Sequence, residues 1–221
     1  MKNHSAARSK FSIYILAVTF LIFINISYSQ VDTTKNNPVL GKDTVVDFGT
    51  YSQKLNGIFV SPFMGLEWPV KNFNNTSKSA FTYGIKLEFA GFKLYPVILG
   101  LIYKYQKNPG KDDFMTAQLL NTFDTKISSF GITADILLNK YIHSNFTLPF
   151  LTLEVKYLSV QRIISPDIIT LNYKTTDNLI GITAGAGFTL SIFDIYGGYT
   201  FAKDYSSAEI MTRIHFALIK F

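Results

Sequence analysis

The stretch that decides the fold is Ile180-Gly181-Ile182-Thr183-Ala184-Gly185-Ala186-Gly187-Phe188-Thr189-Leu190-Ser191-Ile192, in which every even position is apolar and every odd position is Gly, Thr or Ser. Strict alternation is typical of a β-strand, whose successive side chains leave on opposite faces. A half-buried strand of a soluble protein usually carries long polar groups on its wet face. Here the second face is small and uncharged. The pattern predicts a strand whose apolar face meets lipid and whose small face is crowded inside a narrow barrel.

Similar alternation recurs along the rest of the chain. In the second of these stretches, for example, Phe81, Ile85 and Phe89 share one face while Thr82 and Lys86 share the other. The predicted strands cover about 57–67, 80–90, 93–105, 126–138, 147–160, 180–192, 194–203 and 208–221. We therefore predict an all-β fold, namely a closed antiparallel up-and-down transmembrane β-barrel of eight strands.

The predicted connections alternate in length. They are long after the first, third and fifth strands, tight around Gly91 and Asp194, and intermediate after the fourth strand. Such alternation is expected when one end of a barrel faces the periplasm and the other faces the outside. Both chain termini would then lie on the periplasmic side. The short connection at 204–207 departs from this trend.

Aromatic residues gather at both ends of the predicted strands, with aliphatic residues between them. This placement is typical of membrane barrels, whose rings lie at headgroup depth, and a soluble β-sandwich gives no reason for it. The outer ends carry Trp68, Phe81, Tyr83, Tyr103, Tyr105, Tyr157 and Phe201, and the periplasmic ends carry Phe89, Tyr95 and Phe188.

The N-terminus has the pattern of a secretory signal peptide. Basic residues precede an apolar run over 11–26, and Ser27-Tyr28-Ser29 follows it, which predicts cleavage between Ser29 and Gln30. The alternative is an uncleaved anchor, but the run is shorter than the about 20 residues that a helical span needs. The predicted domains are a signal peptide over 1–29, a flexible periplasmic segment over 30–56 and the barrel over 57–221.

Composition excludes several classes of function. Without residues 1–29 the basic residues number 21 − 3 = 18 against 15 acidic ones, and the resulting charge of +3 is too small to indicate nucleic acid. The chain has no cysteine, so neither a disulfide nor a lipid-anchored cysteine is possible. Asp32-Thr33-Thr34 and Asp43-Thr44-Val45 resemble a bacterial O-glycosylation sequon, although chance explains such short matches better.

Together, the signal peptide, the eight alternating strands, the loop order and the terminal Phe221 resemble the small eight-stranded outer-membrane β-barrel family of Gram-negative bacteria. The resemblance covers 57–221. It implies that Phe221 is an assembly signal read by the barrel-assembly machinery, that the wall contacts outer-membrane lipid, and that no cofactor is needed. The alternation before Phe221 matches only partly, because Arg213 and His215 interrupt it. Such a fold does not by itself fix a function.

Charged residues fall on the predicted inner faces, and none falls on the outer faces of the second to seventh predicted strands away from the strand ends. A Lys facing lipid at mid-depth would cost about 2–4 kcal/mol, and an unpaired buried charge is also costly. We therefore predict an ionic network that fills the lumen. For Lys86, Asp135 and Glu154 we expect pairing, whereas for Glu67, Glu88 and Lys104 we expect solvation near strand ends. The predicted inner charges are Glu67, Lys86, Glu88, Lys104, Asp135, Glu154 and Lys156.

An enzymatic site is not expected. Beyond the predicted signal peptide the chain has two histidines, His143 in a turn and His215 in the last strand, the latter without an obvious Ser partner at the same depth. Both are predicted to be structural. No cluster of His, Asp and Glu has metal-ligand spacing.

The predicted loops are the remaining functional surface. Residues 106–121 and 161–176 contain apolar groups that either extend the strands beyond the membrane or bind a partner. We predict a non-enzymatic outer-membrane barrel with a filled lumen, which is structural or binds a partner through its loops or periplasmic tail. A small outer-membrane pore and a soluble lipocalin-like ligand carrier are the alternatives.

Overall fold

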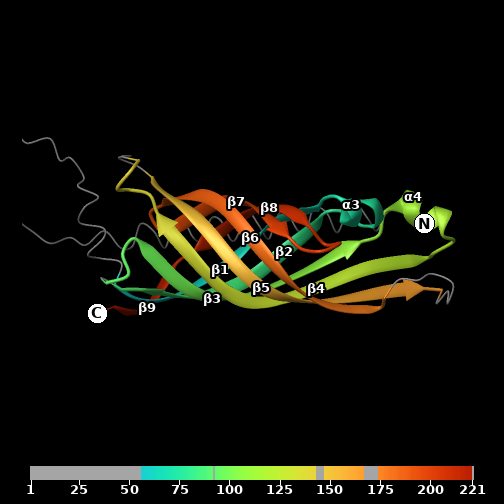
Figure 1. Cartoon of the computed structure of the whole chain (residues 1–221), viewed down its shortest axis with the longest axis horizontal. Coiled ribbons are helices and arrows are strands. Elements are labelled where there is room, and N and C mark those ends of the chain that lie inside the picture. The colour runs from blue at the N-terminus through green and yellow to red at the C-terminus, as the bar shows by residue number, and fades with distance from the viewer. Residues whose placement is uncertain (1–55, 92, 143–146, 167–173, 221) are drawn as a thin grey trace, which may run out of the picture. The chain divides into compact units, whose positions relative to one another are not determined.

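The computed structural model describes residues 56–91, 93–142, 147–166 and 174–220. Within them, nine strands and two short helices follow one another (Figure 1). The elements are β1 (Gly57–Pro69), α3 (Asn72–Thr76), β2 (Ala80–Ala90), β3 (Val97–Pro109), α4 (Asp112–Ala117), β4 (Thr122–Leu137), β5 (Leu148–Ser165), β6 (Thr176–Leu190), β7 (Phe193–Phe201), β8 (Ser207–Ile214) and β9 (Phe216–Lys220). None of the helices described is long and apolar enough to cross a membrane.

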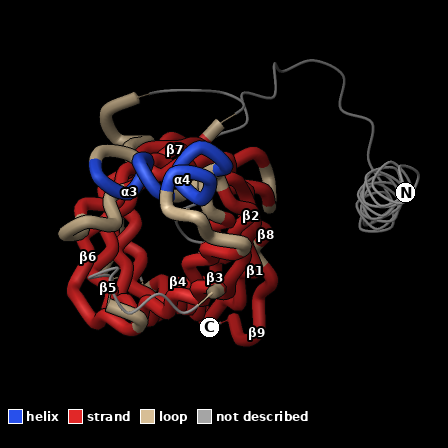
Figure 2. Tube along the Cα trace, turned by 90° about the vertical axis from the view of Figure 1, so that its right-hand side faces the viewer, coloured by secondary structure: helices blue, strands red, loops and turns tan. Residues whose placement is uncertain are grey.

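The strands close into an antiparallel barrel. Each strand from β2 to β8 pairs with its neighbours in sequence, and β1 pairs with β2 on one edge and with both β8 and β9 on the other. Since β8 and β9 occupy one position in succession, the wall has the eight positions predicted from the sequence. Figure 2 views this ring of strands from the end that carries α3 and α4, here called the helical end. At the opposite end the wall begins at Gly57 and finishes at Lys220, which are partners across the closing seam.

Pro62 lies where the closing seam is interrupted. β1 pairs with β8 as far as Phe63 and Arg213, and its pairing with β9 resumes at Val60 and Phe216. Pro62, which has no N–H to donate, therefore lies opposite the gap between β8 and β9 on one side and is aligned with Ile85 of β2 on the other.

Two further irregularities lie at Pro96 and in the last strand. Pro96 precedes β3, which begins at Val97, so it removes no bond from that strand. The pairing of β9 with β1 shifts register between Ile58 and Phe59, which indicates a β-bulge. Phe221, the predicted assembly signal, lies outside the described residues, as do the predicted signal peptide, the sequon-like segments, His143 and nearly all of the predicted periplasmic segment.

The two faces of the wall differ as predicted. On β2, Phe81, Ile85 and Phe89 are 53%, 46% and 41% exposed, so this apolar row does not pack into a protein core. The small face of β6 points into a crowded interior: a Cβ added to Gly187 would lie 2.4 Å from the Cβ of Tyr196. Glycine at this position allows the wall and the Tyr196 ring to approach closely.

At the helical end, strands run further than the sequence predicted. β3 continues to Pro109, β4 begins at Thr122, β5 continues to Ser165 and β6 begins at Thr176, beyond the tyrosines of the predicted outer belt. The prediction that part of the long loops extends the strands is confirmed for the described residues. The helices α3 and α4 were not predicted, because helices as short as these contain too few turns for a 3.6-residue pattern to be recognised.

Candidate functional site

Arg213 on β8 is the centre of the charge cluster inside the barrel. Its Nη1 donates to Glu88 Oε1 at 2.8 Å and to Asp135 Oδ2 at 2.6 Å, and its Nε donates to Asp194 Oδ2 at 2.7 Å. The four side chains are nearly completely buried. Three carboxylates from β2, β4 and β7 thus converge on one guanidinium, whose rigid fork of donors suits such convergence.

Lys86 on β2 connects this cluster to a second carboxylate group. Its Nζ lies 2.9 Å from Glu154 Oε1 and 3.9 Å from Asp135 Oδ1, and it donates to Thr133 Oγ1 at 3.3 Å. Lys156 donates to the other oxygen of Glu154 at 2.7 Å. A continuous chain of charges therefore runs from β5 across β2 and β4 to Arg213.

His215 completes this chain at the gap between β8 and β9. Its Nε2 lies 2.7 Å from Asp194 Oδ2, and its Nδ1 lies 2.9 Å from Glu88 Oε2 and 3.0 Å from Ser61 Oγ. Since a carboxylate faces each ring nitrogen, the geometry favours an imidazolium that donates to both. We call Glu88, Asp135, Glu154, Asp194, Lys86, Lys156, Arg213 and His215 the Arg213 network. With His215 charged, its four anions balance its four cations.

The sequence-based expectation that His215 has no serine partner is wrong, because cross-strand pairing brings Ser61 to it. Ser61, His215 and Asp194 make the contacts of a Ser-His-Asp triad, but their chemistry differs. Ser61 donates its hydroxyl hydrogen to Glu88, so that hydrogen does not go to the imidazole. Ser61 is also fully buried. The arrangement therefore provides no activated nucleophile.

Lys104 on β3 forms a separate charge group closer to the helical end. Its Nζ lies 2.5 Å from Glu67 Oε2 and also bonds Glu209 Oε2. Ser207 donates to the remaining Glu67 oxygen at 2.5 Å. We call Lys104, Glu67 and Glu209 the Lys104 triad. It has one cation and two anions, so it carries an excess of negative charge.

Apolar and aromatic side chains fill the space beside these charges. The Lys86 Nζ lies 5.4 Å from the ring centroid of Tyr196, and the Arg213 Cζ lies 5.4 Å from that of Phe150, so both cations rest on aromatic faces. The Phe63 ring lies over its cross-strand partner Gly84 on β2, where an added Cβ would lie 2.3 Å from the ring. The buried members of this layer are Phe63, Ile102, Leu137, Phe150, Tyr196 and Met211.

A second apolar cluster closes the lumen at the helical end. Phe73 of α3 meets Tyr205 of the β7–β8 connection edge-on, with ring centroids 5.5 Å apart. Burial raises the pKa of the Tyr205 hydroxyl above its ordinary value, and the nearby Arg162 guanidinium offsets only part of this rise. We call the cluster the apolar cap; its buried members are Phe73, Ile127, Leu158, Val160, Ala202 and Tyr205.

The structure brings the predicted inner charges together, with one correction. Lys86, Asp135, Glu154 and Lys156 are buried and in contact, whereas the expectation that Glu67, Glu88 and Lys104 are solvated is wrong. These three are only 3%, 2% and 4% exposed. Glu67 and Lys104 lie below the apolar cap, whereas Glu88, nearer the opposite end, is covered by Arg213, His215 and Ser61. Over the ranges that the structure describes, no group of three or more His, Asp or Glu side chains could hold a metal ion.

Four charged members of the lumen were missed from the sequence. Asp194 was assigned to a turn, and Arg213 and His215 were interpreted as interruptions of the last strand. Glu209 and Arg213 occupy alternate positions with Met211 between them, and all three are buried. Because Ile210 was predicted to face outward, its odd-numbered neighbours Glu209 and Arg213 should face inward, and this alternation was the available signal.

The inversion of polarity across the wall decides the class of fold. On the outer face, each of the eight strand positions of the wall exposes large apolar side chains. On the inner face, acidic and basic side chains are buried and paired. Water would favour the reverse arrangement, whereas hydrocarbon outside the wall favours this one. The chain has the fold of the small eight-stranded outer-membrane β-barrels.

Comparisons with known proteins found similar solved structures. One solved structure similar to it is Neisserial surface protein A (NspA), with 14% identity and a TM-score of 0.48, which covers 73% of this chain and 98% of that one. Another is the Yersinia pestis outer membrane protein Ail in a phospholipid bilayer nanodisc, with 13% identity and a TM-score of 0.39, which covers 72% and 99%. The barrel matches no protein-family model and no curated protein.

Proposed function

We propose that this protein is a non-enzymatic barrel of the outer membrane with a closed lumen, which serves as a scaffold and presents its helical end to the outside for binding. The observation that carries the proposal is the continuity of the Arg213 network across the lumen. From Lys156 to His215 every member contacts at least one opposite charge, and all except His215 are nearly completely buried.

A closed lumen follows from the energetics of this packing. A permeating ion would have to separate buried charge pairs, and leaving one buried charge without its partner costs about 3–5 kcal/mol. It would then have to pass the apolar cap, whose only polar side-chain group among the six cluster members is the Tyr205 hydroxyl. Both barriers oppose the alternative of a small pore. The paired charges also oppose the alternative of a lipocalin-like carrier, whose interior must accept an apolar ligand.

Single-channel recording of the purified protein in planar bilayers tests the closed lumen. We expect no steady conductance from the wild type. The double variant Arg213→Ala/Lys86→Ala should show openings, because it removes the two cations that hold the carboxylates together. Ile85→Ala, on the lipid-facing side of the same wall, is the matched control and should remain silent. A large, steady conductance of the wild type would refute the proposal in favour of a pore.

Exposed apolar side chains at the helical end support a binding role there. Leu119, which follows α4, is 82% exposed with a positive φ of 55°, and Ile163 near the end of β5 is 41% exposed. A non-glycine residue in the left-handed region is uncommon, and for a bulky one it is an outlier that invites a functional reading. Both residues lie beyond the predicted tyrosine belt, where lipid gives no reason for their exposure.

A photo-crosslinking amino acid at position 119, introduced into the protein in its native membrane, tests this role. We expect a discrete adduct that is absent when the same group replaces Lys140 at the opposite end. If position 119 gives no adduct beyond those seen at 140, the binding role is wrong and the scaffold role alone remains.

A further inference from the structure

At the helical end, the outer wall has a shallow lane between two large rings. Cross-strand pairing sets Trp68 of β1 and Tyr199 of β7 on either side of Ala208 of β8. In the next row the small residue is Gly197 of β7, whereas Ile210 of β8 and Leu66 of β1 are large. Ala208 and, beside the next row, Gly197 leave room on a surface that is otherwise covered by long side chains.

Directly above this lane lies a pocket of about 200 Å³. It is formed where the chain leaves β1 and where it passes from β7 to β8, and it is lined by Val70, Lys71, Asn72, Ala202, Lys203, Asp204 and Ser206. Lys71 and Asp204 have positive φ values of 53° and 61°. Both are non-glycine residues with a positive φ, a backbone conformation that such residues rarely adopt.

The pocket is electropositive. Lys71 and Lys203 supply two positive charges against one negative charge from Asp204, whose Oδ1 accepts a hydrogen bond from Asn72 Nδ2 at 3.4 Å. The Ser206 hydroxyl is occupied by Ala202 O at 2.9 Å. Over the described part of the chain neither lysine forms an ion pair, and both are exposed. The two ammonium groups therefore remain available to an anion from outside.

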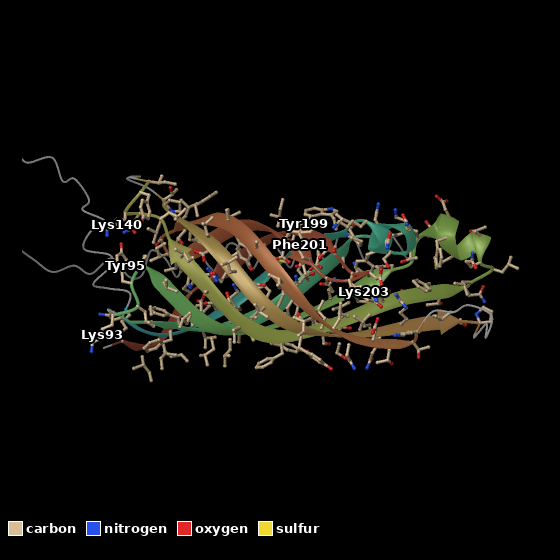
Figure 3. The ribbon with its side chains drawn as sticks, viewed as in Figure 1. Lys93, Tyr95, Lys140, Tyr199, Phe201 and Lys203 are labelled. Carbon is tan, nitrogen blue, oxygen red and sulfur yellow. The ribbon has the colours of Figure 1, made fainter. Side chains whose placement is uncertain are left out.

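Lys71 also connects the pocket with the lane below. Its Nζ lies 6.0 Å from the ring centroid of Tyr199, whose ring lies at 4.5 Å centroid distance from that of Phe201 and is tilted by 54° against it. Figure 3 shows Tyr199, Phe201 and Lys203 close together toward the helical end. Going outward along this face, aliphatic residues give way to aromatic rings and then to lysine, which is the order of hydrocarbon, interface and headgroup in a lipid leaflet.

We infer that this place binds a lipid with a phosphate headgroup: Lys71 and Lys203 hold the phosphate, and one acyl chain lies along Ala208 between Trp68 and Tyr199. Lysine binds phosphate as a point charge, and basic pockets at a membrane interface recognise anionic headgroups. The inference rests on the proposed membrane location. It goes beyond the proposed function, because it assigns a specific lipid contact to one side of the wall.

Trp68 makes the site directly observable, because it is the only tryptophan of the chain. The full-length protein is reconstituted into vesicles of unlabelled zwitterionic phosphatidylcholine that contain a fixed fraction of one brominated-chain lipid, either phosphatidic acid or phosphatidylcholine. Bromine quenches tryptophan on contact. We expect brominated phosphatidic acid to quench Trp68 several-fold more effectively than brominated phosphatidylcholine at the same fraction.

Two variants localise the effect. Lys71→Gln/Lys203→Gln should remove the preference for phosphatidic acid while the general quenching persists. Lys93→Gln/Lys140→Gln, which removes two lysines at the other end (Figure 3), should leave the preference intact. A heat-modifiable shift on gels confirms that each variant is folded.

The outcomes are distinguishable. Equal quenching by both lipids would overturn the lipid site while supporting the membrane location. No quenching by either would overturn the membrane location itself, and with it the proposed function. If inorganic phosphate at millimolar concentration abolished the preference, the pocket would be a site for a free anion, and the lipid assignment would be wrong.

Discussion

The Arg213 network and the Lys104 triad answer the same problem, charges buried in one lumen, in different ways. In the network, each of the four acids contacts two cations, and cations and anions balance. In the triad, one ammonium serves two carboxylates with no second cation in contact. Since a buried charge is costly when unpaired, the network is redundant and the triad is not.

The two groups also tie together different parts of the wall. The network joins β2, β4, β5, β7 and β8, including strands on opposite sides of the lumen, whereas the triad joins β1, β3 and β8. Removal of the central cation should therefore have different consequences in the two groups, and the variants below test this from the largest expected effect to the smallest.

Arg213→Met should have the largest effect. It leaves Glu88, Asp135 and Asp194 without their common donor, and we expect a loss of about 5 kcal/mol in the free energy of unfolding, at the upper end of the range for breaking a buried pair. The measurement is unfolding by guanidinium in lipid vesicles, followed by Trp68 fluorescence. Arg213→Lys, which keeps the charge but not the fork of donors, should recover part of the loss. Lys126→Met, outside the lumen, is the control and should change little.

Lys104→Met should destabilise the barrel by about 3 kcal/mol, because two carboxylates then remain buried without a cation. Combining it with Glu67→Gln and Glu209→Gln should restore most of the stability, since replacing a whole buried charge group is often nearly neutral. Failure of the triple variant to recover would show that the triad is not an isolated group.

Lys86→Met tests the redundancy of the network. Glu154 keeps Lys156 and Asp135 keeps Arg213, so we expect a loss of about 2 kcal/mol, comparable with one hydrogen bond to a charged group. The same unfolding measurement applies. A loss as large as that of Arg213→Met would contradict the distinction between the redundant and the central cation.

His215→Gln should have the smallest effect, about 1 kcal/mol. The amide can still donate to one carboxylate, and the side chain at this position is 21% exposed, so water compensates part of the lost charge. A loss above that of Lys86→Met would indicate that the imidazolium, rather than Arg213, holds Glu88 and Asp194 together.

Alternation predicted the barrel well wherever one face meets lipid along the whole strand. β2 was predicted with its observed bounds, and Lys86 and Asp135 were placed inside by phase alone. The lipid-facing row gives a long signal with period two, and charges are excluded from it by their cost. These are local properties, so one sequence suffices to recognise them.

The contacts of the lumen could not be predicted in the same way. Arg213 meets Asp135 across the lumen, and which residues face each other there depends on the stagger of the closed sheet. Asp194 lies beside a turn and His215 in a gap between strands, so neither belongs to a clean alternating run. The apolar cap joins α3 to the β7–β8 connection, and neither segment has a pattern that indicates its partner.

The gap opposite Pro62 divides the closing seam into two separately paired sections. Among the described residues, every other pair of neighbouring strands forms an unbroken hydrogen-bond ladder. The break therefore places the least cooperative part of the sheet where the first and last strands meet. The backbone amides on either side of the gap should consequently differ in their protection from hydrogen exchange. The barrel is closed by two separate sections of strand pairing rather than by one continuous one.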